Sequence, residues 1–323
     1  MKAAIFLGPS EIVVKDVPEP KPDDRNLILK IHRASICNGS DSAVLKGERD
    51  IIKAHPELKF PMIGGHECSG EIVHAGKHAE GGFNIGDRIA FWCKAEGAFT
   101  EYNDIYPQYY AIARLSSNIS YDEGSIMEML GSTMCRGTLV ELGETVVVLG
   151  LGPAGLLLVQ EAKISGASKV IGVDMCKLRL DKAMELGADA VVDAGKENVA
   201  KVINEKFGRV DDVIHATGKN LFNLPLEIIK DRGKLIMYGC VDEGITFDSN
   251  YCLYHGIDII GFKMPYLDRI RELMAFGEKL VSLGRLKIKP LITHHIKLEG
   301  IAEGIKMCAY KPGECIKVVV DIM

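Results

Sequence analysis

The order of apolar and polar positions divides the chain into two kinds of segment. From about Thr145 onward, short apolar runs alternate with stretches in which apolar positions recur at helical spacing. The runs predict strands at 145–149, 169–173, 190–192, 212–216, 234–238 and 257–261. Between them, helical periodicity is clear over 154–167 and 177–188, and each of these stretches ends near a glycine. This alternation predicts an α/β domain with a six-stranded parallel sheet, doubly wound by crossover helices.

Residues 1 to about 120 follow a different pattern. Short alternating strands are interrupted by Gly- and Pro-rich turns such as "EPKPDD" and "HAEGGFNIGDR", which is typical of an antiparallel, barrel-like β domain. Strand character returns in "LITHHIKLEG" and "ECIKVVVDI", after a helical pattern over 267–284. We therefore expect a β-rich domain over 1–130, the α/β domain over 131–270, and a return to the β-rich domain over 271–323.

Composition and charge narrow the class of protein. The 323 residues are 47% apolar and 26% charged, which is typical of a globular protein with room for two domains. Its 39 basic and 44 acidic residues are interleaved, so no basic cluster favours nucleic acid as a partner. No apolar stretch reaches the length of about 18 residues that a membrane span needs, and the apolar run within residues 1–14 is too short for the apolar core of an export signal. We expect a cytoplasmic protein without a membrane partner.

The nine cysteines are scattered, and none has another within six residues. This spacing excludes a C-x-x-C dithiol and a four-cysteine zinc lobe, and the odd number argues against a disulfide framework. We expect most of these cysteines to be small buried apolar residues.

A glycine-rich loop follows the first predicted strand of the α/β domain. The sequence "GLGPAG" comprises Gly150, Leu151, Gly152, Pro153, Ala154 and Gly155, and it opens a helix. In G-x-G-x-x-G spacing the glycines permit a tight turn and close approach of a pyrophosphate, which the N–H groups at the helix N-terminus bind. The motif alone is weak evidence, but here a predicted strand precedes it and a predicted helix follows it.

The second strand ends at Asp174, which lies 24 residues after Gly150. A carboxylate at this place can accept hydrogen bonds from the ribose hydroxyls of an adenosine and repels a 2′-phosphate, so the sequence predicts NAD(H) rather than NADP(H). Lys177 and Arg179 follow closely. Either could contact a 2′-phosphate or lie along the adenine, and we count Arg179 among the cofactor-binding residues.

Four residues are candidate zinc ligands because of their chemistry and their positions in the sequence. His66 and Glu67 follow two glycines in "FPMIGGHECSGEIV", an otherwise apolar, strand-like segment. Cys37 lies near the end of a predicted strand in "ASICNGSD", and Glu128 lies among methionines and leucine in "SIMEMLGSTMC". An isolated carboxylate in such apolar surroundings is costly unless it is paired or bound to a metal. A thiolate, an imidazole and one or two carboxylates form an open zinc site.

Several motifs together resemble one family. The segments "ASICNGSD", "GGHECSGEIV", "IGDRI", "GAFTEY" and "GLGPAG" occur in the order found in the zinc-dependent medium-chain alcohol and polyol dehydrogenases, and the likeness covers nearly the whole chain. The resemblance implies a GroES-like catalytic domain, a Rossmann dinucleotide-binding domain, and a zinc ion in the cleft between them. It also implies a homodimer or homotetramer that oxidises a small-molecule alcohol.

The resemblance assigns roles to the candidate residues. Cys37 and His66 match the first two zinc ligands, and Glu128 is similar in position to the remaining one, although it could instead cap a helix or pair with Arg136. Glu67 matches a glutamate that ligates zinc in sorbitol-dehydrogenase-like members and lies behind the metal in others, and both roles stay open. The carboxylate-rich ligand set favours secondary alcohols, polyols and sugar alcohols or their ketones as substrates.

Two departures from the family pattern bear on these assignments. Between Phe91 and Tyr102 only Cys93 remains of the structural zinc lobe, so we expect one catalytic zinc ion per chain. The hydroxyl of Ser40, our candidate for proton transfer, stands three places after Cys37, where many relatives have it two places after.

Two other functions are compatible with the same fold. A zinc-free reductase of activated alkenes or quinones would transfer hydride without these ligands. A non-catalytic nucleotide-binding protein would retain the fold alone, although such proteins usually lose the ligands that persist here.

Overall fold

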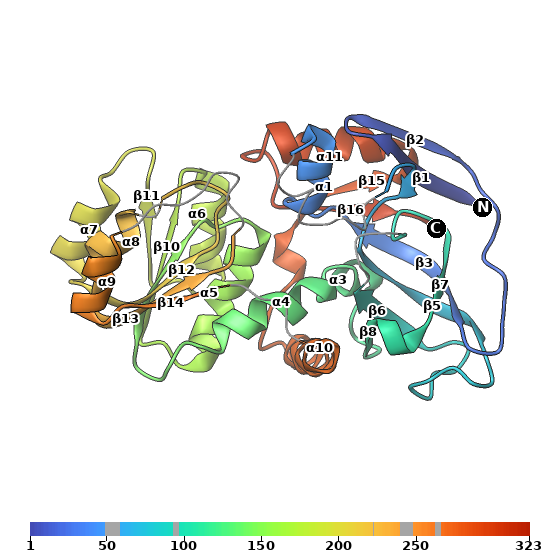
Figure 1. The fold of residues 1–323 in the computed structure, drawn as a ribbon, viewed down its shortest axis with the longest axis horizontal. Coiled ribbons are helices and arrows are strands. Elements are labelled where there is room, and N and C mark those ends of the chain that lie inside the picture. The colour runs from blue at the N-terminus through green and yellow to red at the C-terminus, as the bar shows by residue number, and fades with distance from the viewer. Residues whose placement is uncertain (49–58, 93–96, 222, 240–247, 262–265) are drawn as a thin grey trace. The chain divides into compact units, whose positions relative to one another are not determined.

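A computed structural model of the chain describes residues 1–48, 59–92, 97–221, 223–239, 248–261 and 266–323. It divides into two compact units. The first consists of Met1–Ser132 and Pro265–Met323, and the second of Thr133–Met264. Figure 1 shows the fold, coloured from blue at the N-terminus to red at the C-terminus.

The second unit contains the parallel sheet that the sequence predicts. Its strands lie in the order β11-β10-β9-β12-β13-β14, and every neighbouring pair is parallel. The order reverses direction at β9, so the carboxyl ends of β9 and its neighbours form the crevice where open α/β sheets bind their ligands. The strands are β9 (Thr145–Leu149), β10 (Lys169–Asp174), β11 (Ala190–Asp193), β12 (Val210–His215), β13 (Ile229–Met237) and β14 (Asp258–Ile260).

Burial on both faces explains the composition of the central strands. Val146 through Leu149 in β9 have no exposed surface, and Val213 and Ile214 in β12 are equally buried. A strand covered on both faces by helices requires a continuous apolar run rather than alternation. The helices of this unit are the end of α4 (Met127–Gly137), α5 (Pro153–Ser165), α6 (Lys177–Glu185), α7 (Val199–Lys206), α8 (Asn223–Ile228) and α9 (Ser249–His255).

The first unit is built mainly from antiparallel strands. One sheet has the order β15-β16-β3-β5-β6-β8, with β7 also paired to β3, and a smaller sheet has the order β2-β1-β4. The bounds are β1 (Lys2–Gly8), β2 (Glu11–Asp16), β3 (Leu27–Ser35), β4 (Met62–Ile63), β5 (Glu67–Ala75), β6 (Arg88–Trp92), β7 (Tyr102–Ile105), β8 (Ala111–Arg114), β15 (Ile292–Lys297) and β16 (Lys317–Asp321).

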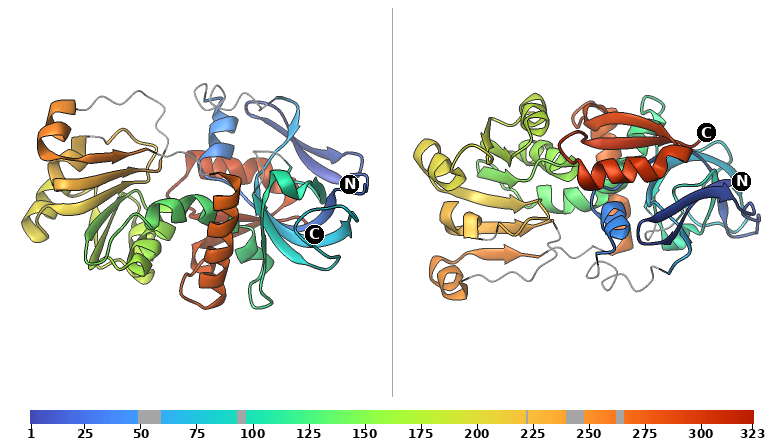
Figure 2. Two further views of the ribbon diagram at one scale, coloured as in Figure 1. Left: turned by 60° about the horizontal axis from the view of Figure 1, so that its bottom comes forward. Right: turned by 90° about the horizontal axis from the view of Figure 1, so that it is seen from above.

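The C-terminal segment completes this sheet. β16 pairs antiparallel with β3, which places Val319 opposite Ser35. In the two further views, the C-terminal segment, in red, belongs to the same unit as the N-terminal strands, in blue (Figure 2). One pair departs from the antiparallel pattern: β15 and β16 are parallel. The reason is helix α11 (Ile301–Tyr310), which joins them as a crossover connection.

The first unit contains several short helices and one longer helix, α10. Helix α3 begins with a capping box, in which Ser120 accepts from the Glu123 N–H and the Glu123 side chain accepts from the Ser120 N–H. Among the described residues, no helix is both long and apolar enough to cross a membrane. The remaining helices are α1 (Ser40–Lys46), η1 (Pro107–Tyr109), α3 (Tyr121–Gly124), α10 (Leu267–Ser282), η2 (Lys289–Leu291) and η3 (Leu298–Gly300).

A carboxyl group is buried inside the second unit. Glu161 on α5 is 2% exposed, and the Thr133 hydroxyl donates to its Oε1 over 2.7 Å. Oε2 has no hydrogen-bond partner among the described residues. Burial raises the pKa of Glu161 to about 8, against the smaller opposing effect of Thr133. The folded protein therefore holds a proton on Glu161 at neutral pH.

This proton makes stability depend on pH. The unfolded chain loses it near pH 4.5, whereas the folded chain retains it to about pH 8. Between these values the folded state binds more protons, so the free energy of unfolding falls by up to about 1.4 kcal/mol for each pH unit that the pH rises. Glu161→Gln keeps an acceptor for Thr133 but cannot ionise. We predict that the melting temperature of E161Q exceeds that of the wild type by a margin that widens from pH 5 to pH 8.

The matched control is Glu205→Gln, which removes a solvent-exposed carboxylate on α7 that is paired with Lys201. Its melting temperature should show no comparable divergence from the wild type. A margin for E161Q that stays constant over this pH range would contradict the assignment.

Candidate metal centre and nucleotide loop

The pairing of β3 with β5 brings the candidate ligands together. The two strands are antiparallel, and their register ends where Ser35 lies opposite Glu67. Cys37 lies two residues beyond the end of β3, and His66 lies one residue before β5. Because antiparallel neighbours place these two chain ends side by side, Cys37 and His66, 29 positions apart in the sequence, meet at one edge of the sheet.

The two glycines before His66 are required by close packing. A Cβ atom on Gly64 would lie 2.2 Å from the Phe6 ring, and one on Gly65 would lie 2.8 Å from the Phe99 ring. Gly65 also has a φ of +84°, which side chains rarely adopt. The glycines thus let the chain pass against two core aromatics and turn His66 toward Cys37.

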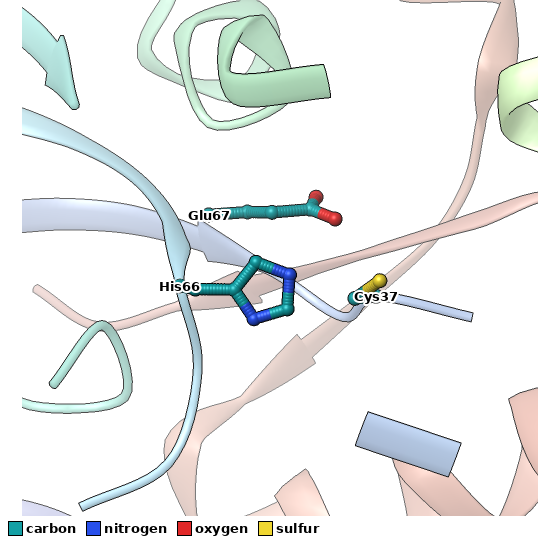
Figure 3. A group of neighbouring side chains, drawn as sticks. All are labelled: Cys37, His66 and Glu67. Carbon is teal, nitrogen blue, oxygen red and sulfur yellow. The ribbon is translucent and has the colours of Figure 1, made fainter. Parts of the chain in front are cut away.

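Three side chains converge at this edge. The ligand atoms of Cys37, His66 and Glu67 all lie within 4.8 Å of one another. Figure 3 shows the Glu67 carboxylate and the His66 ring extending side by side toward the Cys37 sulfur. A tetrahedral zinc ion with bonds of about 2.0–2.3 Å places its ligands roughly 3.5 Å apart. The ligand atoms would need to approach one another by at most about 1.3 Å to reach that spacing.

The two carboxylate oxygens of Glu67 have different surroundings. Glu67 has no exposed surface, and its Oε2 accepts from the Lys317 ammonium over 2.5 Å and from the Ser35 hydroxyl. Its Oε1 has no hydrogen-bond partner among the described residues. A buried carboxylate oxygen without a partner is costly, and a metal ion beside it removes that cost. The observed contacts therefore fit a metal ligand.

The charges around His66 favour a cation. Burial lowers the pKa of His66, but the adjacent Cys37 sulfur, together with Asp41 and Glu128, holds it well above 6.5. The same surroundings that stabilise an imidazolium stabilise a metal ion at this point. The donor set of sulfur, nitrogen and oxygen is one that zinc prefers.

Residues 37 to 41 form a tight turn around the sulfur. The Ser40 N–H donates to Cys37 Sγ over 3.4 Å, and the Cys37 N–H donates to Asp41 Oδ2 over 2.8 Å. The Ser40 hydroxyl lies 3.6 Å from the sulfur, and the residue is exposed. Gly39 precedes helix α1 and is also exposed. Ser40 is therefore close to the metal centre, although its part in proton transfer stays a prediction.

Glu128 is not one of the three converging side chains, but it lies close enough to His66 and Glu67 for their charges to affect its pKa. It is 7% exposed and occupies the first turn of α4, where the helix dipole favours a carboxylate. Burial raises the pKa of Glu128 to about 7, His66 opposes the shift and Glu67 adds to it. Its ligation of the metal stays a prediction.

The glycine loop has the geometry that a pyrophosphate site needs. Gly150 has a φ of +91°, and a Cβ atom on Gly155 would lie 1.9 Å from the Gly150 carbonyl oxygen. Gly152 precedes α5 and Pro153 begins it, where proline is favoured because no N–H is needed. The loop therefore tolerates no side chain at either of its ends, as the predicted nucleotide turn requires.

Asp174 ends β10 next to this loop. Its Oδ2 accepts from the Leu151 N–H over 2.8 Å, and its Oδ1 accepts from the Met175 and Cys176 N–H groups. Arg179 lies 3.8 Å from Oδ2 as an ion pair, and Lys177 pairs with Asp181 instead. Both basic side chains that could contact a 2′-phosphate therefore face carboxylates of the same chain.

The chain segments that follow strands β12 and β13 lie beside the glycine loop. A Cβ atom on Gly150 would lie 2.9 Å from Thr217, and one on Gly239 would lie 2.3 Å from the Thr217 carbonyl oxygen. The segments after β12 and β13 therefore pack beside the loop. Residues 240 and 241, which continue the segment after β13, lie outside the described residues, as does Cys93, the one cysteine that remains of the structural zinc lobe.

Sequence reasoning missed two residues that position Glu67. Lys317 is 1% exposed, and besides Glu67 it donates to the Ile36 carbonyl over 2.8 Å. Burial lowers the pKa of Lys317, but Glu67 and Cys37 raise it to a value above 10.5. The signal was a lysine inside the apolar strand "IKVVV", and the pairing partner was not visible because 250 positions separate Lys317 from Glu67. Ser35 carried no signal.

Two models of known protein families match this chain, and together they include residues of both units. A family model described as "Alcohol dehydrogenase GroES-like domain" matches residues 23–141, and one described as "Zinc-binding dehydrogenase" matches residues 153–282. The L-threonine 3-dehydrogenase of Shewanella frigidimarina is 29% identical, and the alignment covers 99% of each chain. The sorbitol dehydrogenase of Bombyx mori is 25% identical over 99% of this chain and 98% of its own. The 2R,3R-butanediol dehydrogenase structure from Bacillus subtilis has the same fold, with a TM-score of 0.84 at 22% identity over 100% and 99% of the two chains.

The buried pair leads to a prediction about stability. Lys317→Met leaves Glu67 buried without its cation, which should lower the free energy of unfolding of the metal-free protein by about 3–5 kcal/mol. Urea unfolding followed by the fluorescence of Trp92, the single tryptophan, reports on this unit because Trp92 lies opposite Glu67 in the sheet.

Lys306→Met serves as the control, since Lys306 is an exposed lysine paired with Glu303 on α11. Lys317→Arg retains the charge and should lose less stability than K317M. If K317M and K306M unfold at the same urea concentration, the proposed role of the pair is wrong.

Proposed function

Because the chain belongs to the zinc-dependent medium-chain alcohol and polyol dehydrogenases, we propose that it transfers a hydride between NAD(H) and a secondary alcohol, polyol or sugar alcohol, or the corresponding ketone. One observation carries the proposal: Cys37, His66 and Glu67 converge, and the open carboxylate oxygen of Glu67 is buried. Packing alone explains neither feature. These three residues would hold one zinc ion per chain.

The chain's own residues define what the site does. Zinc, when bound, supplies Lewis-acid polarisation of a substrate oxygen. Cys37 and Glu67 bring negative charge to the site, while Lys317 and Ser35 fix the Glu67 carboxylate from behind. Glu128, whose pKa burial raises to about 7, is the proposed further ligand or proton-holding group. Ser40 is exposed beside Cys37 and is the proposed group that passes a proton to solvent.

The cofactor assignment depends on the loop and Asp174. The N–H groups from Gly150 to Gly155 would bind the pyrophosphate, and Asp174 and Arg179 would bind the adenosine end. The Asp174 carboxylate already accepts three backbone hydrogen bonds, so its orientation is fixed before the cofactor arrives. A fixed negative charge at this place favours the ribose hydroxyls of NAD over a 2′-phosphate.

The substrate class follows from the ligand set and the relatives. Relatives named as threonine, sorbitol and butanediol dehydrogenases support a secondary alcohol or polyol. The substrate is a small molecule. Assembly as a homodimer or homotetramer, a cytoplasmic location and the domain limits at 130 and 270 stay predictions.

The first test removes the sulfur ligand. In Cys37→Ser a hydroxyl replaces the thiolate, which zinc prefers, so metal content should fall from about one zinc ion per chain to near zero. Turnover should fall by about a thousandfold or more, measured by NADH absorbance with a panel of polyols and secondary alcohols.

The control for this test is Cys252→Ala, which removes a buried thiol from the second unit. It should keep both zinc and activity. Unchanged turnover in C37S, or full activity of the wild type after zinc removal by a chelator, would favour a zinc-free reductase.

The second test concerns cofactor preference. Asp174→Asn removes the charge but keeps a side-chain acceptor, so the ratio of kcat/KM for NAD to that for NADP should fall by about tenfold or more. The matched control Glu185→Gln removes an exposed carboxylate on the adjacent helix α6, which pairs with Lys182, and should leave the ratio unchanged. A wild-type enzyme that prefers NADP tenfold would refute the assignment.

A further inference from the structure

Two buried cysteines lie in contact at the end of helix α11. Cys308 is 3% exposed and Cys315 has no exposed surface, and the Cys315 thiol points at the Cys308 sulfur with the two Sγ atoms 3.9 Å apart. The four residues between the helix end and Cys315, at 311–314, are all exposed. Two thiols at this separation need to approach by roughly 1.9 Å to form a disulfide of about 2.05 Å. An exposed turn between them can allow that movement.

The pair is directly connected to the metal centre. Cys315 continues into Ile316, whose N–H donates to the Thr293 hydroxyl over 3.0 Å and whose carbonyl accepts from Asn38 over 3.1 Å. The next residue, Lys317, holds Glu67. Asn38 is itself the neighbour of Cys37 in the chain. A displacement of Cys315 would therefore move Lys317, which holds Glu67, and would also disturb the hydrogen bond from Asn38, the neighbour of Cys37, to the Ile316 carbonyl.

We propose that Cys308 and Cys315 form a thiol-based redox switch, in which an intramolecular disulfide displaces the start of β16 and reversibly lowers activity. This pair is a site that neither zinc binding nor nucleotide binding uses. Neither cysteine belongs to the converging ligand group, which contains only Cys37 among the described cysteines.

The oxidant we propose is hydrogen peroxide. It is small and uncharged, so it can reach two thiols that are almost fully buried. The thiolate of one cysteine attacks the peroxide, forming a sulfenic acid and releasing hydroxide. The thiol of the other displaces water from that sulfenic acid to form the S–S bond. In total, two thiols and one peroxide become one disulfide and two waters, so the cysteines lose two electrons and two protons.

Burial determines the rate of this reaction. The contact with Cys315, together with desolvation, raises the pKa of Cys308, so the reactive thiolate is scarce. The nearby Lys317 ammonium acts in the opposite direction. We therefore expect slow oxidation, and equally slow reduction because the disulfide is shielded from bulky thiols. These are the properties of a device that responds to sustained rather than brief oxidative conditions.

Peptide mapping tests the disulfide directly. Zinc-loaded wild-type protein is treated with hydrogen peroxide, its free thiols are alkylated, and it is cleaved after glutamate without reduction. Cleavage at Glu303 and Glu314 separates Gly304–Glu314 from Cys315–Met323, so only a disulfide keeps these two peptides together. We expect the linked peptide, lighter by two hydrogen atoms than the sum of its parts, and its disappearance after dithiothreitol. Absence of the linked peptide would overturn the proposal.

The activity measurement tests the consequence. Peroxide should lower kcat of the wild type by about tenfold, because a displacement on the order of 1 Å in a catalytic site has effects of this size or larger. Dithiothreitol should restore activity, and the zinc content should not change. The variants Cys308→Ala and Cys315→Ala should resist this loss, whereas the control Cys252→Ala should lose activity like the wild type.

Three results would overturn the proposed switch. The first is a linked peptide with an unchanged kcat, and the second is an equal loss of activity in the two alanine variants. The third is a loss of activity that zinc release accounts for, which would indicate that Cys37 is the oxidised group. The activity arm rests on the proposed function, but the peptide map does not. An inactive untreated enzyme would thus count against the proposed function, while the linked peptide would still decide whether the disulfide forms.

Discussion

Moving a carboxylate from water into a protein interior costs several kcal/mol unless a cation and hydrogen-bond donors accompany it. Glu67 meets this condition on one oxygen, through Lys317 and Ser35, and leaves the other oxygen open beside Cys37 and His66. The metal centre depends on this arrangement, because a rigidly held carboxylate keeps the same direction with or without an ion. It also ties the C-terminal strand to the N-terminal ones, since Lys317 belongs to β16 and Ser35 to β3.

The second unit meets a different constraint by similar means. A phosphate site needs backbone N–H groups that approach a ligand without side chains in between. Gly155 leaves no space for a Cβ atom against Gly150, and Asp174 fastens the loop through the Leu151 N–H. In both units, therefore, an acidic side chain is fixed by neighbours before any ligand binds. This preorganisation lowers the cost of binding, because less conformational freedom remains to be lost.

Local signals predicted much of this structure. The six strands of the parallel sheet appear where β-branched runs occur, because strands buried on both faces need continuous apolar segments. The family resemblance is confirmed, and the candidate ligands Cys37, His66 and Glu67 do meet. Lys317, Ser35 and the Cys308–Cys315 contact could not be predicted, because each depends on strand register or helix packing between distant segments. The parallel pairing of β15 with β16 was missed for a related reason: its cause is the crossover helix, not a feature of either strand.

The central claim is that one sulfur, one imidazole and a buried carboxylate hold a single zinc ion. X-ray absorption at the zinc edge of the metal-loaded protein measures the ligand atoms directly. The account predicts one sulfur neighbour at about 2.3 Å and nitrogen or oxygen neighbours at about 2.0–2.2 Å. A zinc ion with no sulfur neighbour, or with several, would contradict it.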